Sequence, residues 1–381
     1  MSLSPPSGPP GAHFEQLGVT PELLRRVLDA ALARGGDDCD LYFQHSASNT
    51  VSLSDRKVSR IDTSVDLGMG VRVVLGDQVG YAYSEDLSAD ALIAAARAAA
   101  EIAATSPGRV AANPSPSRAF NRSPELKPWA GVDMATRVAL VRQWEKAAFE
   151  RDDRIRRVEA LLRDGSSVVM VVRPDGRCIE DYRPGSIAMV SCVADNNGVR
   201  EGGSYNVAGR AGLELFDPRR TKLLVNEAVD RTLFLLDAGK PPAGEMPVVL
   251  AAGPSAILLH EAIGHGMEAD FNRKGKSIYA DKLNARIASD EVTIVDDGTI
   301  PNSRGAVNID DEGNEGQRTV LVEDGILRSY LHDEISAQHY NVGPTGSGRR
   351  QSFRHPPLPR MRATLMLDGP RDPKEIIASV E

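Results

Sequence analysis

Cysteine and aromatic residues are scarce in this chain of 381 residues. The three cysteines, Cys39, Cys178 and Cys192, lie far apart and form no C-x-x-C pair, so the sequence indicates neither a disulfide framework nor a cysteine-only metal site. A reducing, cytoplasmic location is the expectation that follows. Because aromatic residues make up only 5%, the core has to be built from Val, Leu, Ile and Ala.

Long apolar runs and an excess of positive charge are absent as well. The longest apolar stretch, residues 246–259, is shorter than a membrane span and is interrupted by Gly253-Pro254-Ser255. Residues 1–12 are rich in Pro, Ser and Gly, which favours a disordered tail over a signal peptide. The 45 Lys and Arg residues against 53 Asp and Glu give a formal net charge of −8, which disfavours nucleic acid as the main partner. We expect a soluble protein that contacts no membrane.

Motifs for nucleotide binding and serine hydrolysis are missing too, since no Walker loop, G-x-G-x-x-G fingerprint or G-x-S-x-G elbow occurs. The segment Asn308–Gly313 begins like a calcium loop, but Thr319 stands where the bidentate glutamate is needed. The carboxylates of Asp296-Asp297 and Asp310-Asp311-Glu312 lie beside glycines, which predicts side chains that form turns.

The hydrophobic pattern predicts an α+β fold of two domains, in which antiparallel sheets are flanked by helices. The boundary expected from Lys240 to Gly244 gives an N-terminal domain over residues 13–244 and a C-terminal domain over residues 245–381. Helices are expected over about 21–33, 88–104, 134–150 and 218–236. Strands are expected over 71–75, 79–83, 168–172, 178–182, 187–194, 246–251 and 292–295, and a hairpin over 320–330. Long loops are expected over 105–128 and 341–360.

The most informative pattern is His260-Glu261-Ala262-Ile263-Gly264-His265, on a helix expected directly after an apolar strand. Zinc favours neutral imidazole ligands, and a glutamate beside them can take a proton from metal-bound water that then attacks a carbonyl. The residue types therefore fit a metallopeptidase. The alternative is two histidines that cap a helix end beside an ordinary glutamate.

The spacing of the two histidines requires an irregular helix. Residues five apart on a regular helix lie about 140° apart around the axis, so both could not bind one ion. A single π-bulge, in which one extra residue enters a turn, would bring His265 back to the side of His260. Gly264 and Gly266 flank the second histidine and supply the freedom for such a distortion. The sequence predicts a distorted helix that carries the metal pair.

Further candidates stand around this motif. Glu268 and Asp270 could bind the metal or hydrogen-bond a histidine, or could be solvated acids at the end of the helix. Arg349 and Arg350, in a glycine-rich loop, could hold a peptide carboxylate or carbonyl groups, or could belong to a mobile surface loop. Of the other histidines, His332 and His339 are spare ligands of low weight, whereas His13, His45 and His355 are isolated in the sequence and favour solvated or hydrogen-bonded roles.

Several blocks together closely resemble the TldD/PmbA family, and they span nearly the whole chain. The most specific is residues 260–273, and the others are Val295-Asp296-Asp297-Gly298-Thr299, Asp310-Asp311-Glu312-Gly313, Gly348-Arg349-Arg350 and Pro359-Arg360-Met361. The resemblance implies a cytosolic zinc metalloprotease of a family also described as modulators of DNA gyrase. It further implies a sister subunit of the TldE/PmbA type without the metal motif, and a chamber between the two in which unfolded or short peptides are cut.

The resemblance also assigns roles to residues. His260 and His265 would bind the zinc ion, and Glu261 would be the general base. The third ligand of the family is a cysteine near the far C-terminus, and this chain, which stops roughly a hundred residues earlier than family members usually do, has no counterpart. We therefore expect a C-terminal domain that lacks its last part.

Two functions stay open on this evidence. The first is a zinc-dependent peptidase subunit that acts on unfolded or short peptides. The second is a catalytically silent binding or scaffold subunit that pairs with a TldE/PmbA-like sister chain, because two imidazoles hold zinc less tightly than a three-ligand site. A direct action on gyrase is weaker, since the acidic composition provides no route to DNA.

Overall fold

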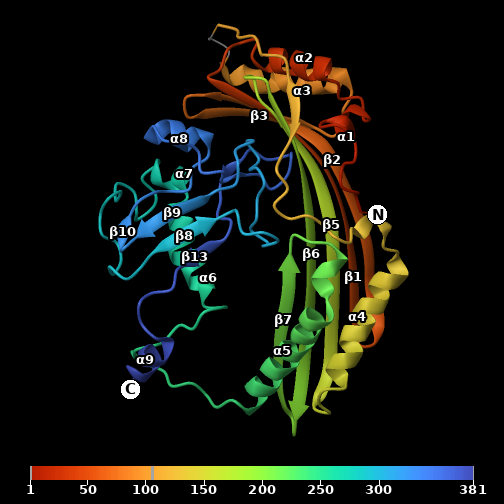
Figure 1. The fold of residues 1–381 in the computed structure, drawn as a ribbon, viewed down its shortest axis with the longest axis vertical. Coiled ribbons are helices and arrows are strands. Elements are labelled where there is room, and N and C mark those ends of the chain that lie inside the picture. The colour runs from red at the N-terminus through yellow and green to blue at the C-terminus, as the bar shows by residue number, and fades with distance from the viewer. Residues whose placement is uncertain (1, 104–106, 381) are drawn as a thin grey trace.

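The computed structural model describes residues 2–103 and 107–380. It contains a large sheet, a smaller sheet, a two-stranded ribbon and short helices around them (Figure 1). The strands of the large sheet are β1 (Asp38–Ser54), β2 (Lys57–Leu75), β3 (Gln78–Ser84), β4 (Ser115–Arg118), β5 (Ile155–Val172), β6 (Arg177–Asn196) and β7 (Val199–Gly209). The helices that accompany this sheet are α1 (Ala12–Glu15), α2 (Pro21–Ala31), α3 (Ala89–Ala100), α4 (Met134–Phe149) and α5 (Pro218–Asp237).

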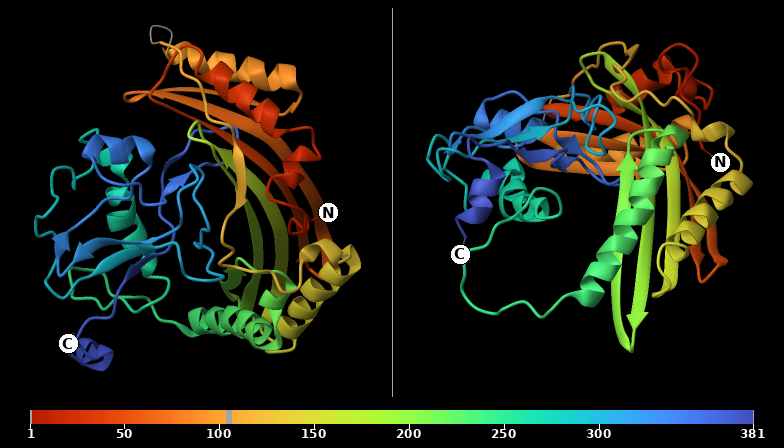
Figure 2. Two further views of the ribbon diagram at one scale, coloured as in Figure 1. Left: turned by 45° about the horizontal axis from the view of Figure 1, so that its top comes forward. Right: turned by 60° about the horizontal axis from the view of Figure 1, so that its bottom comes forward.

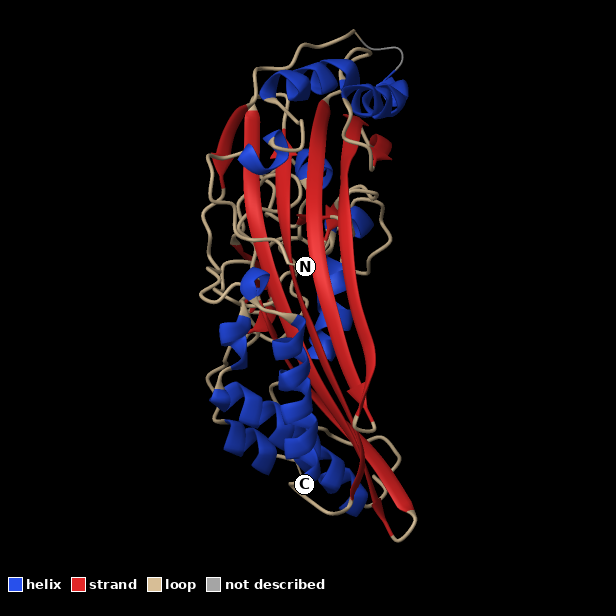
Figure 3. Cartoon of the chain, turned by 90° about the vertical axis from the view of Figure 1, so that its right-hand side faces the viewer, coloured by secondary structure: helices blue, strands red, loops and turns tan. Residues whose placement is uncertain are grey.

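The large sheet is built from hairpins. Its strand order is β3-β2-β1-β5-β6-β4, with β7 also paired to β6, and every pair is antiparallel except β4 with β6. Two-residue turns connect β1 to β2, β2 to β3 and β6 to β7, and Asn197 and Gly198 between β6 and β7 have φ angles of 53° and 88°, which suit a tight hairpin turn. Four of the strands have 17 to 20 residues and run along the length of the molecule (Figure 3).

One face of this sheet carries the helices. Alternate strand residues such as Leu41, Val71 and Val168 pack under α2 and α3, and Val51, Leu162 and Val190 belong to a second core that includes residues of α4 and α5. Side-chain oxygens cap the helices: Thr20, Ser88, Asp133 and Asp217 each accept a hydrogen bond from a backbone N–H of the first turn. The predicted helices are confirmed here to within a few residues.

The opposite face of the sheet receives the C-terminal domain. Tyr42, Val169 and Val171 point to this side and pack with Ile309 and Phe353 from the second half of the chain. Tyr81 donates a hydrogen bond of 2.6 Å to the carbonyl oxygen of Phe353, which ties the same two parts together. The bent sheet curves around the domain that it holds (Figure 2).

The C-terminal domain has its own small core around Met267, Leu321 and Tyr330. Its four-stranded sheet has the antiparallel order β10-β9-β8-β13. The elements are α6 (Ala256–Leu259), α7 (Ala269–Asn272), β8 (Ile294–Asp297), β9 (Arg318–Glu323), β10 (Ile326–Leu327), α8 (Glu334–Tyr340), β11 (Gly348–Arg349), β12 (Leu358–Pro359), β13 (Thr364–Met366) and α9 (Pro373–Ala378). The predicted α+β class with antiparallel sheets and flanking helices is confirmed.

The apolar strand predicted over residues 246–251 is wrong. This segment forms no secondary structure and lies in the long connection between α5 and α6 (Figure 2), where Met246, Val248 and Leu250 are exposed. A strand needs a neighbour for its backbone N–H and C=O groups, and no described strand pairs with this segment. Composition alone could not reveal that the neighbour was missing.

The first residues also differ from the expected loose tail. Ser2 is buried, and its hydroxyl donates to Asp164 Oδ1 at 2.9 Å and accepts from the Asn49 amide at 2.9 Å. The prediction for residue 1 lies outside the described residues. None of the described helices is both long and apolar enough to cross a membrane.

Candidate metal centre

The His-Glu motif lies where α6 loses its regular geometry. After Ala256–Leu259 the chain continues through a π-helical turn, His260–Gly264, and then a 3-10 turn, His265–Met267. The backbone N–H of His265 donates to the carbonyl oxygen of His260, an i to i+5 hydrogen bond that defines the wide turn. The distorted helix predicted from the five-residue spacing is confirmed.

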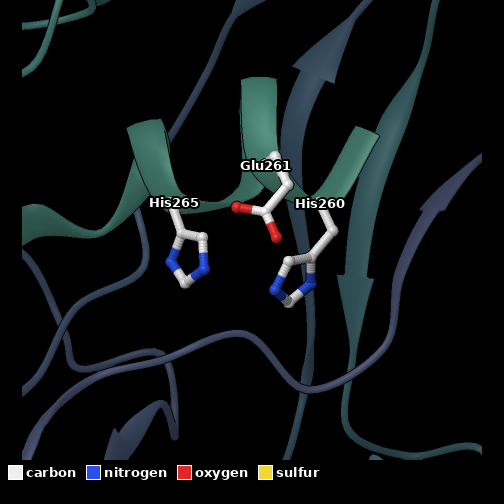
Figure 4. Close-up of side chains that lie close together, drawn as sticks. All are labelled: His260, Glu261 and His265. Carbon is white, nitrogen blue, oxygen red and sulfur yellow. The ribbon is translucent and has the colours of Figure 1, made fainter. Parts of the chain in front are cut away.

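The wide turn places the two imidazoles on the same side of the helix, with the carboxylate of Glu261 beside them (Figure 4). The ring centroids of His260 and His265 lie 4.7 Å apart at an interplanar angle of 83°. One ligand atom from each of the three side chains lies within 4.8 Å of the other two. Within residues 2–103 and 107–380, no other group of three His, Cys, Asp or Glu side chains is gathered in this way.

This donor set fits a zinc ion. Two imidazoles and a carboxylate are among the ligands that zinc takes in proteins, and zinc–nitrogen bonds of ~2.0 Å require ligand atoms about 3.3 Å apart. The three ligand atoms lie somewhat farther apart than that, but the side chain of Glu261 is exposed, so its carboxylate can rotate inward. His260, Glu261 and His265 are therefore the residues that could hold the metal.

The glycines of the motif allow the helix to approach its neighbours closely. A Cβ added to Gly264 would lie 1.9 Å from the sulfur of Met361, and one added to Gly266 would lie 2.6 Å from the ring of Tyr279. Leu259 and Ile263 pack against the small core of the domain. The irregular turn is therefore held from one side by close packing, while its histidines face the other.

Glu268 orients one of the two rings. Its Oε1 lies 3.1 Å from Nδ1 of His265, and its Oε2 accepts from Nη1 of Arg360 at 2.9 Å. Burial raises the pKa of the Glu268 carboxyl, against the opposing effects of Arg360 and His265. A hydrogen bond at Nδ1 fixes the ring and leaves Nε2 for a metal. Of the two acids considered at this position, Asp270 has no contact with either histidine among the described hydrogen bonds and ion pairs.

The two arginines predicted to bind substrate differ in the structure. Arg350 has a fully buried side chain that forms an ion pair with Asp40 and lies over the rings of Tyr42 and Tyr81 at 5.0 and 5.6 Å. Its guanidinium thus already has these partners, and a substrate-binding role for Arg350 stays a prediction. Arg349 is only partly buried, and its Nη1 donates to the carbonyl oxygen of Met361 at 3.2 Å.

The acidic clusters expected to form turns do so only in part. Asp310 accepts hydrogen bonds from the backbone N–H groups of Glu312 and Asn314, as a turn-forming side chain does. Asp311 instead pairs with Arg183 at 2.5 Å, and Glu312 with Arg72 at 2.7 Å, all of them deep in the molecule. Burial raises the pKa of Asp310 to about 6 and that of Glu312 to about 8.

These buried ion pairs join the two domains, and sequence reasoning did not find them. Arg72 on β2 lies between Asp40 on β1, at 2.5 Å, and Glu312 in the C-terminal domain. Asp40 also pairs with Arg350. The sequence could have indicated them through one feature: a charged residue lies inside each of two apolar strands. Such a residue predicts an ion pair, because a buried charge needs a partner.

Comparison with known proteins identifies the family. Three family models match the chain: PmbA/TldA metallopeptidase domain 1 over residues 39–103, the central domain over residues 127–236, and the C-terminal domain over residues 243–381. The "Metalloprotease TldD homolog" of Haemophilus influenzae is 38% identical over 95% of this chain and 77% of its own length. The "Zinc metalloprotease TldD homolog" of Saccharolobus solfataricus is 37% identical over 40% of this chain and 34% of its own length.

Solved structures show the same fold at lower identity. TldE from Thermococcus kodakarensis matches with a TM-score of 0.72 and 19% identity, and a Thermotoga maritima protein described as a candidate modulator of DNA gyrase matches with 0.77 and 16%; each match covers 94% of this chain and 80% of the other. The chain belongs to the TldD/PmbA metallopeptidase family.

Proposed function

We propose that this chain is a zinc-dependent peptidase subunit that hydrolyses peptide bonds of unfolded or short peptides. The observation that carries the proposal is the convergence of His260, Glu261 and His265 within 4.8 Å, produced by the π-helical turn. The metalloprotease names of the relatives support the same reaction class, and one of them specifies zinc.

In this proposal the ring nitrogens of His260 and His265 hold the ion. When bound, zinc supplies a Lewis acid that polarises a carbonyl oxygen and increases the acidity of water. The carboxylate of Glu261 accepts the proton of the attacking water and passes it to the nitrogen of the leaving amine. Glu268 keeps the His265 ring in one orientation through the 3.1 Å contact at Nδ1.

The open position of the site suits a flexible substrate. Glu261 is exposed at the surface of the domain, so an extended peptide chain can reach it. We further propose a cytoplasmic protein with a TldE/PmbA-like sister chain as partner, which the likeness to TldE supports. No direct nucleic-acid partner is proposed.

Zinc analysis and peptide cleavage by the same set of variants test the proposal. Glu261→Gln should still bind zinc but should lose cleavage of an unfolded fluorogenic peptide by at least ~100-fold, within the range of a lost general base. The double variant His260→Ala/His265→Ala should lose both. Glu22→Gln, an exposed acid at the start of α2, is the matched control and should change neither. Cleavage that survives in Glu261→Gln would contradict the proposal.

A catalytically silent subunit is the second candidate, and one observation favours it. If Glu261 acts as the base, only two imidazoles are left to hold zinc, since no third ligand joins them in the described part of the chain. All three cysteines are buried elsewhere. Zinc-dependent turnover by the 381-residue chain alone would exclude silence, whereas a stable, inactive complex with a sister chain would support it.

A further inference from the structure

The face of the large sheet that receives the C-terminal domain also carries a polar cavity of about 570 Å³. Its floor comes from β1, β5 and β6, at the side-chain positions that alternate with those of the helix-covered core. A second cavity of about 120 Å³ shares Gln44, Ser167, Arg183 and Arg210 with it and continues toward Arg349. The two form one trough, which we call the sheet trough.

Small residues keep the sheet trough open. Ser46 on β1 lies opposite Ser167 on β5, and Gly165 on β5 lies opposite Gly185 on β6. With serines and glycines on adjacent strands, the backbone of the sheet is exposed over a width that large side chains would fill. Strand positions of this kind are unfavourable for packing, which suggests that another group approaches the backbone there.

Arginines without partners surround this floor. Arg163, Arg210 and Arg304 line the sheet trough, and none of them has a side-chain hydrogen bond or ion pair among the described residues. Arg349, at the far end, donates only to the carbonyl oxygen of Met361. In a chain with a formal net charge of −8, four guanidinium groups without carboxylate partners at one place are unexpected.

The carboxylates in and beside the sheet trough form their ion pairs with other arginines. Asp66 pairs with Arg354 and Asp164 with Arg137, and Arg183 occupies Asp311 at 2.5 Å and Asp181 at 2.7 Å. Arg210 is therefore left beside another cation. Burial, followed by the charge of Arg183, lowers the pKa of Arg210 to about 10, against the opposing charges of Asp181 and Asp311.

We propose that the sheet trough binds the carboxylate groups of a peptide substrate, with Arg210 as the central contact and Arg163, Arg304 and Arg349 around it. A planar guanidinium matches a carboxylate through two parallel hydrogen bonds, and low exposure strengthens such a pair. The exposed strand backbone and serine hydroxyl groups beside Arg210 provide hydrogen bonds for the adjoining peptide groups.

Two contacts join the end of the sheet trough to the wide turn of the candidate metal centre. Arg349 lies at its end and donates to the carbonyl oxygen of Met361, and the sulfur of Met361 lies against Gly264 in the wide turn. This inference rests on the proposed peptidase function for its choice of ligand.

Binding can be measured without catalysis, so the two proposals can fail separately. The probe is a fluorescent, unstructured neutral peptide, prepared with a free C-terminal carboxylate, with a C-terminal amide, and as an amide with one internal glutamate. Fluorescence anisotropy with the 381-residue Glu261→Gln protein in the presence of a chelator reports affinity alone. A tighter complex with the free acid points to the terminus as the ligand, and a tighter complex with the glutamate peptide points to an acidic side chain.

The variants then locate the site. Arg210→Gln should weaken binding of the carboxylate peptide about tenfold and leave the neutral amide unchanged, while Arg210→Lys should recover part of the loss because it restores the charge. Arg97→Gln removes an exposed arginine of α3 that also lacks an ion pair and should change nothing. The midpoint temperature of thermal unfolding should be no lower for Arg210→Gln than for the parent protein, since the substitution removes no ion pair of the folded state.

Equal affinity for all three peptides, or equal loss with Arg97→Gln and Arg210→Gln, would overturn the assignment of the sheet trough. If binding depends on the carboxylate but the zinc-loaded parent protein cleaves no peptide, the sheet-trough proposal stands and the peptidase proposal fails. If the protein cleaves peptides but binding does not depend on the carboxylate, the peptidase proposal stands and the sheet-trough proposal fails.

Discussion

The sulfur of Met361 lies so close to Gly264 that a methyl group on this glycine would stand 1.9 Å from it. Gly264→Ala therefore requires the wide turn or the side chain of Met361 to move, even though alanine is the better helix former. We expect zinc affinity and peptide cleavage to fall at least tenfold, because the two imidazoles would separate. Competition with a chelating dye measures the affinity.

Two further variants make this test specific. Gly343→Ala, at a glycine with no atom within 4 Å of an added Cβ, should change neither zinc affinity nor cleavage. Gly264→Ala combined with Met361→Ala should recover part of the loss by opening space. If Gly264→Ala alone kept full zinc affinity, the close approach would have no part in shaping the centre.

Replacement of Glu268 should weaken the metal site without touching a metal ligand. Glu268→Ala removes the group that holds Nδ1 of His265 and leaves Arg360 without its partner. Losses of about 10–100-fold in metal affinity or activity are typical of such changes. Zinc titration of the variant checks this, with Glu323→Ala, an exposed glutamate of β9, as the control. Unaltered zinc affinity in Glu268→Ala would show that the ring is fixed by other contacts.

The buried ion pairs between the domains should control stability. Arg72→Met leaves Glu312 without a countercharge in the interior and leaves Asp40 with Arg350 alone, and breaking a buried pair costs about 3–5 kcal/mol. Urea unfolding should show this loss. Arg60→Met, on the same strand but in an exposed pair with Asp62, should show almost none. Equal stability of the two variants would mean that the buried network is neutral for folding.

His332 should make stability depend on pH. Burial lowers the pKa of this side chain from 6.5 to about 4. Between these values the unfolded chain binds a proton that the folded chain does not, so stability is lost as the pH falls from 6.5 toward 4. The difference corresponds to ~3 kcal/mol. Urea unfolding at a series of pH values measures it.

His332→Phe keeps an aromatic ring next to Tyr330 and Tyr340 and removes the titration. The stability of this variant should fall less steeply over the same pH range, while other titrating groups contribute equally to both proteins. Parallel pH profiles for the two proteins would assign the acid sensitivity to other groups.

Local patterns in the sequence predicted much of the fold and the centre of the site. Thr20-Pro21, Asp175-Gly176 and Asn197-Gly198 act through their own dihedral angles and caps, so their elements could be identified without neighbours. His260 and His265 are five residues apart, so they could bind one metal ion only if the helix were distorted, and the wide turn is that distortion.

Features that depend on distant partners could not be predicted in the same way. Residues 246–251 have the composition of a strand, but pairing is decided by which strands lie next to them. Arg350 pairs with Asp40, 310 positions away in the chain, and no local pattern predicts that contact. Arg210 likewise has no ion pair because the nearby Asp181 and Asp311 both pair with Arg183.

The long hairpins of the large sheet have a consequence for how the protein can be divided. Strands β1 and β5 run side by side from the core under α2 and α3 to the core that includes residues of α4 and α5, so each strand belongs to both. The first and central family domains, residues 39–103 and 127–236, are thus joined by the β1–β5 ladder. Expressed apart, each would expose half of a severed sheet to aggregation.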